Sequence, residues 1–231
     1  MKKIVLVLAL LLVTSVGWAE SEKEKAEKRL EDAADVLRSM VQAPDKGIPE
    51  EVLAHAKCIA VIPHEIKGGF IVGAAHGRGV ATCRTNTGWS APAFFSISGG
   101  SWGAQIGLEG VDNVLVFMNQ KGVAKLLSSK FQIGGDLSAA AGPIGRHASA
   151  GTDWKMDTEI LSYSRAKGAF AGATLNGAVV QPDADAMTAL YGPKVTTRAV
   201  LTGAVPPPPE ARAFLTTVAR VARKSVRDTN A

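Results

Sequence analysis

The residue pattern with the clearest catalytic potential is Ser164-Arg165-Ala166-Lys167, a Ser-x-x-Lys sequence. In penicillin-recognising enzymes such a serine opens a helix, so the lysine lies one turn away and can assist its attack. Here Ser164 ends a strand-like segment, and Gly168 follows Lys167 directly. The partner sequences Ser-Asp-Asn and Lys-Thr-Gly do not occur. The pattern therefore does not predict an acyl-transfer site.

Other signatures of catalysis or cofactor binding fail on spacing. His64-Glu65 begins like the zinc-binding helix of a metalloprotease, but Gly68 stands where the second histidine is required. A phosphate-binding loop needs Gly-Lys-Ser/Thr, whereas Lys167 precedes Gly168. The sequence Gly-x-Gly-x-x-Gly is absent. We therefore predict a protein that is not an enzyme, without a catalytic residue, a metal site or a cofactor.

The first nineteen residues have the pattern of a secretory signal. Lys2 and Lys3 precede the apolar run Ile4–Val13, which is short for a membrane span, and Gly17-Trp18-Ala19 has the small residues of a cleavage site. Removing residues 1–19 takes away two lysines and lowers the formal charge from +5 to +3. Such a mildly basic, exported chain is a poor partner for nucleic acid. We expect a periplasmic protein, either free or peripheral to an envelope membrane.

The two cysteines, Cys58 and Cys83, give a second indication about the compartment. In an oxidising environment an even pair suggests one disulfide. Each cysteine lies at the outer end of an apolar segment, and two such segments could face each other in a hairpin. Two buried free thiols fit the same pattern, so the residues alone leave both alternatives open.

Five segments are expected to be helical. The first, Glu20–Gln42, places Ala26, Leu30, Ala33 and Leu37 at three- and four-residue steps, which gives one apolar stripe. The others are Pro49–Ala56, Asn119–Ser128, Asp183–Tyr191 and, after the prolines 206–209, Glu210–Arg227.

The middle of the chain is expected to consist of strands and tight turns. Twenty of the 24 glycines lie between Gly68 and Gly177, and interior glycine disfavours helices by about 1 kcal/mol relative to alanine. We expect the chain to break at Pro63, to turn at His76-Gly77-Arg78 and to bend at Gly99–Gly103. The expected strands are Cys58–Ile62, Gly69–Ala75, Gly79–Cys83, Ala91–Ser98, Ala104–Glu109, Val111–Met118, Glu159–Ser164 and Gly168–Val180.

Because helices bracket this strand region, the predicted fold class is α+β. We expect a glycine-rich, mainly antiparallel sheet or barrel-like core, flanked by N-terminal and C-terminal helices.

Several ordered motifs in the central region resemble the SYLF domain family. They are Lys67–Gly73, Gly77–Val80, Gly88–Pro92, Gln105–Gly107, Val114–Met118, Gly134–Arg146 and Ile160–Gly177. The resemblance covers about Glu24 to Gly192. It divides the chain into a signal peptide (1–19), a SYLF-like domain (20–195), and a proline-rich linker with a basic C-terminal helix (196–231).

The resemblance implies lipid binding without catalysis. Eukaryotic SYLF proteins bind phosphoinositide membranes, and one branch binds actin, whereas bacterial members are commonly small exported proteins without SH3 or FYVE modules. An exported protein meets no actin and few phosphoinositides, so anionic phospholipid is the expected ligand here. The alternative is a periplasmic structural or adaptor protein that binds an unknown protein partner.

Two groups of residues are candidates for lipid contact. The first consists of basic residues at or near strand ends and turns, which either gather into one patch or remain scattered: Lys67, Arg78, Arg84, Arg146, Arg165 and Lys167. The second belongs to the terminal helix, which either inserts into a membrane surface or packs on the core: Phe214, Arg220, Arg223, Lys224 and Arg227.

Overall fold

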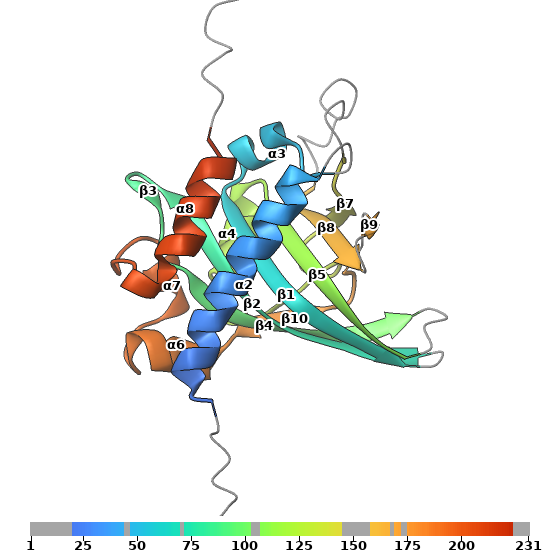
Figure 1. Ribbon diagram of the computed structural model, residues 1–231, viewed down its shortest axis with the longest axis horizontal. Helices are drawn as coiled ribbons and strands as arrows, with labels where there is room; N and C mark the ends of the chain where they lie inside the picture. Colours follow the sequence, from blue (N-terminus) through green and yellow to red (C-terminus); the bar gives the residue numbers. More distant parts are fainter. Residues whose placement is uncertain are drawn as a thin grey trace, which may run out of the picture.

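The computed structural model of the chain describes residues 20–43, 47–69, 72–102, 107–144, 158–166, 169–171 and 175–223. The predicted signal peptide at residues 1–19 lies outside these ranges. Within them, strands form one curled, mainly antiparallel sheet, and helices from both ends of the chain pack on it (Figure 1). The predicted α+β class is therefore confirmed.

Four long strands form the middle of the sheet. In spatial order they are β4 (Ala93–Trp102), β2 (Val72–Thr85), β1 (Cys58–Gly69) and β5 (Gly107–Phe117). Shorter strands extend it on both sides: β6 (Phe131–Gln132) and β10 (Val179–Pro182) lie beyond β4, and β8 (Ile160–Ala166), β7 (Ala139–Ala141) and β9 (Ala169–Ala171) lie beyond β5. Strand β3 (Gly88–Trp89) pairs with the end of β2, and β7 pairs with β8 in parallel.

Five helices match the expected segments with shifted ends, and the terminal one ends at Val221 instead of the predicted Arg227. The short helix at Thr197–Leu201 was not predicted. The described helices are α2 (Glu22–Gln42), α3 (Glu50–His55), α4 (Gln120–Leu126), α6 (Ala184–Tyr191), α7 (Thr197–Leu201), the 3₁₀ turn η1 (Pro209–Ala211) and α8 (Arg212–Val221). Helices α2 and α8 lie side by side, and α2 crosses the face of β1 and β2 (Figure 1). None of the described helices is long and apolar enough to cross a membrane.

Helix α2 is attached to the sheet by the predicted apolar stripe. Ala26, Leu30, Ala33 and Leu37 are all fully buried, so the three- and four-residue spacing identified the packed face correctly. A capping box fixes the start of the helix, because the Ser21 side chain accepts the Glu24 backbone N–H and the Glu24 carboxylate accepts the Ser21 N–H. The first turn of α2 therefore has a defined start at Ser21.

Strand β1 does not end at Pro63, and that prediction is wrong. The strand continues to Gly69 because a β-bulge between Ile62 and Glu65 accommodates the proline. His64 in this bulge has a φ of 51°, and its backbone N–H donates to Asp112 Oδ1 at 3.1 Å. A side chain on β5 thus holds the irregular backbone that β1 needs here.

The turn expected at His76-Gly77-Arg78 is also wrong, because β2 is continuous from Val72 to Thr85. A Cβ on Gly77 would lie 2.7 Å from Ile62 Cγ2, and one on Gly79 would lie 2.5 Å from the Phe95 ring. Both glycines allow side chains of neighbouring strands to cover β2 closely.

Two further strand breaks are absent from the described residues. The expected bend at Gly99–Gly103 does not end β4 before Trp102. The expected strands Ala104–Glu109 and Val111–Met118 are replaced, within the described residues, by the single strand β5.

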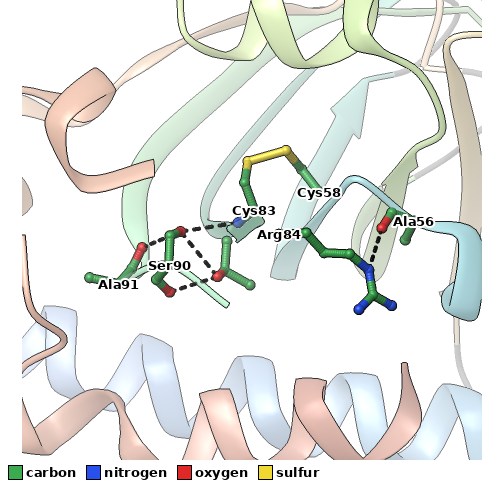
Figure 2. Close-up of a disulfide and its surroundings, with 7 residues drawn as sticks. Ala56, Cys58, Cys83, Arg84, Ser90 and Ala91 are labelled. Atoms are coloured by element: carbon green, nitrogen blue, oxygen red, sulfur yellow. Dashed lines mark hydrogen bonds between the residues drawn. A yellow bond between two sulfur atoms is a disulfide. The ribbon is translucent and has the colours of Figure 1, made fainter. Parts of the chain in front are cut away.

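Cys58 and Cys83 form a disulfide between β1 and β2 (Figure 2). The two residues are direct cross-strand partners with Cα atoms 4.0 Å apart, and they are 0% and 4% exposed. The Ser90 hydroxyl supports this position by accepting the Cys83 backbone N–H at 3.1 Å. Of the two alternatives left open by the residues, the structure therefore has the bonded one.

Glu159 joins three elements at the other side of the sheet. Its carboxylate accepts hydrogen bonds from Lys121 Nζ on α4 at 2.7 Å and from the backbone N–H of Ser138 at 2.7 Å, and it also contacts the Ser138 hydroxyl. Burial opposes ionisation, but the hydrogen bonds from Lys121 and Ser138 outweigh it and lower the pKa of Glu159 from 4.5 to about 2. The ionised carboxylate is thus part of the folded state.

This carboxylate should make stability depend on acid pH. Because its pKa is lowered in the folded state, its contribution is present above about pH 4.5 and is lost as the pH falls toward about 2. Glu159→Gln is expected to lower the free energy of unfolding at neutral pH by about 2 kcal/mol and to flatten its dependence between about pH 5 and pH 3. Urea unfolding across that range checks this. An unchanged slope in the variant would contradict the assignment.

Candidate functional site

A solvent-open groove lies between the first half of α2 and the middle of β1 and β2. Its volume is about 280 Å³. Helix α2 contributes side chains spaced three and four residues apart, and each strand contributes residues from the positions around the bulge. The lining residues are Glu20, Lys25, Lys28, Arg29, Asp32, Pro63, His64, Ile66, His76, Gly77 and Arg78.

Three of the nitrogen-bearing residues that line this groove are largely exposed. Lys28, His64 and His76 are all exposed. Within the described residues, Lys28 and His76 have no ion-pair partner, whereas His64 Nδ1 lies 3.5 Å from Asp112 Oδ1. Ile66, the cross-strand partner of His76, is 55% exposed, which is unusual for a large apolar side chain on a strand. The groove therefore offers groups for an anion next to an apolar contact.

One wall of the groove is a three-residue ion-pair cluster formed by Arg29, Arg78 and Asp183. Arg78 binds both carboxylate oxygens of Asp183, through Nε at 2.8 Å and Nη2 at 2.9 Å. Arg29 Nη1 reaches the same carboxylate at 2.9 Å, and its side chain is 9% exposed. The cluster joins α2, β2 and the start of α6, where Asp183 also caps the helix by accepting the Ala186 N–H.

The cluster is fully ionised. Burial alone would raise the pKa of Asp183, but the hydrogen bonds from Arg78, Ala186 and Arg29 outweigh it and lower that pKa. Burial lowers the pKa of Arg29, which the Asp183 carboxylate counteracts. Arg29 also lies over the Phe94 ring, 5.4 Å from its centroid. These two arginines therefore hold α2 and β2 together at the groove. The carboxylates paired with them compensate their charge.

A second set of side chains fixes the bulge that carries His64. Asp112 accepts the His64 N–H with one oxygen and Arg165 Nη2 with the other, at 2.6 Å. Arg165 Nη1 in turn donates to Ser39 Oγ on α2 at 2.5 Å. The bulge is thus braced from β5, β8 and α2, and it places His64 at the groove.

The basic residues predicted from the sequence do not gather into one patch in the described structure. Arg78 lies at the groove, but it is paired with Asp183 and with Glu22, at 3.3 Å. Arg165 is paired with Asp112. Lys67 lies in β1, and its side chain is outside the described residues, as are Arg146 and Lys167.

Arg84 has a structural environment of its own. Its Nε donates to the Ala56 carbonyl at 2.8 Å, and its Nη2 donates to the carbonyls of Ala54 at 3.1 Å and Ala222 at 2.6 Å (Figure 2 shows the bond to Ala56). The guanidinium lies 4.6 Å from the centroid of the Trp89 ring. Arg84 thus satisfies carbonyl groups at the ends of α3 and α8. Its positive charge therefore faces these carbonyl groups within the protein.

The C-terminal helix is packed on the core. Phe214 is fully buried, so in this conformation its side chain cannot contact a membrane surface. Arg220 and Arg223 are exposed, while Lys224 and Arg227 lie outside the described residues. The helix ends at Val221, with Arg84 bound to the next carbonyl.

Apart from Arg78, sequence reasoning missed the residues that form the groove. Lys28 looked like one of many charges on the polar face of α2, although its three-residue spacing from Lys25 was a usable signal. His64 was considered only as part of a failed zinc motif. Nothing in the local sequence shows that a bulge turns His64 toward α2, or that β2 runs straight through His76.

Comparison with known proteins identifies the family. Residues 98–221, more than half of the chain, match the family model Ysc84, described as "Las17-binding protein actin regulator". The chain belongs to the Ysc84 (SYLF) family. The resemblance to SYLF domains is thereby confirmed, and the family match includes α8.

Members of the Ysc84 family from eukaryotes align with most of this chain. LAS seventeen-binding protein 3 of Saccharomyces cerevisiae is 34% identical over 194 residues, which cover 82% of this chain and 42% of the relative. Protein YSC84 of the same yeast is 33% identical over 192 residues, which cover 79% of this chain and 41% of the relative. Human SH3 domain-containing YSC84-like protein 1 is 31% identical over 194 residues, which cover 83% of this chain and 56% of the relative. The chain spans about half the length of these curated relatives.

Proposed function

We propose that this Ysc84-family protein is exported and binds anionic phospholipid surfaces reversibly, without catalysis, through the groove beside α2. The observation that carries the proposal is the combination of an exposed lysine, two exposed histidines and the exposed Ile66 at one groove. Cationic side chains attract headgroup phosphates, and an apolar side chain beside them can enter the boundary between headgroups and acyl chains.

The expected binding is weak and sensitive to salt. A basic side chain near an anionic surface contributes about 1 kcal/mol, and this attraction falls off within a Debye length of about 8–10 Å. Burial of the exposed part of Ile66 adds on the order of 1 kcal/mol. A few such contributions support reversible association rather than anchoring.

Lys28→Glu tests the groove directly. We expect the fraction of full chain that floats with phosphatidylcholine vesicles containing phosphatidylglycerol to fall about tenfold or more at low salt, because a favourable charge becomes an unfavourable one. The matched control is Lys130→Glu, which makes the same charge change at an exposed lysine that does not line the groove. Equal losses in the two variants would show a net-charge effect and overturn the groove as the site.

The apolar contact and the source of the phosphate need separate tests. Ile66→Ser is expected to weaken flotation about threefold to fivefold, with little change in its salt dependence. Soluble glycerol phosphate should displace little protein, because it offers no apolar boundary for Ile66. Complete displacement would assign the groove to a soluble phosphate compound instead of a membrane surface.

A protein-binding role is the second candidate. The family description and the name of one yeast relative refer to binding of Las17, a protein. Absence of vesicle binding at low salt, together with salt-insensitive capture of one purified envelope protein, would favour this role over lipid binding.

A further inference from the structure

The groove has almost no net charge when its histidines are neutral. Four cations line it, Lys25, Lys28, Arg29 and Arg78, together with the carboxylates of Glu20 and Asp32. Two more carboxylates compensate these cations directly: Glu22 pairs with Lys25 at 2.8 Å and with Arg78, and Asp183 pairs with both arginines. Four positive and four negative groups therefore balance, and the two histidines decide the sign of the groove.

The surroundings of His64 and His76 are consistent with a change of charge. On the β5 side, His64 faces Asp112, whose charge Arg165 compensates. His76 has the uncharged cross-strand partners Ile66 on β1 and Ser98 on β4. From α2, the groups lining the same groove are the balanced set of lysines, Arg29 and acids described above. Both rings are exposed, so water can stabilise either protonation state.

The backbone supports a specific role for His64. A positive φ at a residue other than glycine is uncommon and carries a conformational cost, and His64 is the described non-glycine residue that adopts one. The bulge is braced by Asp112, and it places the His64 imidazole at the groove that Ile66 and its cross-strand partner His76 also line. Bulges commonly redirect a side chain toward a functional site.

We infer that His64 and His76 form a pH-responsive pair that makes the groove cationic in mildly acidic conditions and strengthens its binding of an anionic phospholipid surface. This inference rests on the proposed function and adds its regulation. Histidine ordinarily changes charge between about pH 5 and 8. Protonation of both rings changes the groove from balanced to doubly positive, which favours phosphate-bearing headgroups.

The experiment is flotation of the full chain with phosphatidylcholine vesicles containing phosphatidylglycerol, at about pH 7.5 and about pH 5.5. A phosphodiester headgroup keeps its charge over this range, whereas a phosphate monoester with a second pKa of about 6 would not. The range also lies above that in which Glu159 makes stability depend on pH. We expect the apparent affinity of the unmodified protein to rise about tenfold at the lower pH, since two charges are gained near an anionic surface.

Variants assign the effect to these two rings. His64→Asn keeps a residue that tolerates positive φ, and His76→Gln replaces an exposed ring at a regular strand position. In the double variant the ratio of affinities between the two pH values should fall to below about twofold. His76→Gln alone, which leaves the bulge intact, should lower the affinity ratio from about tenfold to about threefold. His55→Gln, at an exposed histidine on α3 outside the groove, should retain the full ratio.

The outcomes separate this inference from the proposed function. Binding with equal affinity at both pH values overturns the histidine pair and leaves lipid binding by the groove intact. A full pH ratio in the double variant, or its loss in His55→Gln, also overturns the pair. No binding at either pH at low salt removes the proposed function as well.

Discussion

Asp183→Ala is expected to lower the free energy of unfolding by about 3–5 kcal/mol, because it leaves a buried charge without its partner. The side chain of Arg29 is 9% exposed, and among the described residues its ion-pair partner is Asp183. The same substitution removes the bidentate partner of Arg78 and the N-terminal cap of α6. Three elements, α2, β2 and α6, therefore lose their common contact.

Chemical unfolding in urea measures this effect, with Glu22→Gln as the control. Glu22 also pairs with Arg78, but it is 38% exposed, so its removal should change stability little. Replacing both buried partners, with Arg29→Met and Asp183→Leu, should recover part of the loss, because Arg29 no longer leaves an unpaired buried charge and Arg78 keeps Glu22. A loss in Asp183→Ala no greater than that in Glu22→Gln would contradict the structural role given to the cluster.

Loss of the Cys58–Cys83 disulfide is expected to cost about 3 kcal/mol. The bond closes a loop with a sequence separation of 25 residues, and the constraint acts mainly on the unfolded chain. In the folded state β1 and β2 remain paired from Ile59 onward, so the sheet should persist without the bond. We therefore expect the reduced protein to fold, with a lower midpoint of urea unfolding and a steeper slope, because the unfolded chain is less compact without the cross-link.

Two measurements check this prediction. Urea unfolding of Cys58→Ala/Cys83→Ala gives the stability difference, and intact mass before and after reduction should differ by two hydrogens. Because both cysteines are buried, reduction of the native protein should be slow and should accelerate as urea unfolds it. Rapid alkylation of both thiols without a reductant would show that the bond does not form.

Features that depend on neighbours along the chain were predicted well from the sequence. The apolar stripe of α2 identified its buried face, and Asn119 and Asp183 cap α4 and α6 as their residue types suggest. Gly192 ends α6 at a φ of 87°, which glycine adopts easily. The export signal remains a prediction from residue order alone.

Strand boundaries were predicted poorly where contacts between strands override local signals. Pro63 interrupts an apolar run in sequence, but the bulge braced by Asp112 carries β1 through it. Gly77 was predicted to lie in a turn and Gly79 to begin a new strand, yet both lie within β2, where Ile62 and Phe95 leave no room for a side chain. A glycine-rich segment can form either a turn or a tightly packed strand, and contacts with the neighbouring strand determine which of the two forms.

The sequence by itself determined the family, the α+β class and the supply of basic residues. Only the tertiary structure decided which cations are available, because a charge is compensated when the fold brings a carboxylate or a set of carbonyl groups to it. Arg78, Arg84 and Arg165 were selected from the sequence and are bound to Asp183, to helix-end carbonyls and to Asp112. Lys28, His64 and His76, from segments distant in sequence, instead meet at one groove beside Ile66.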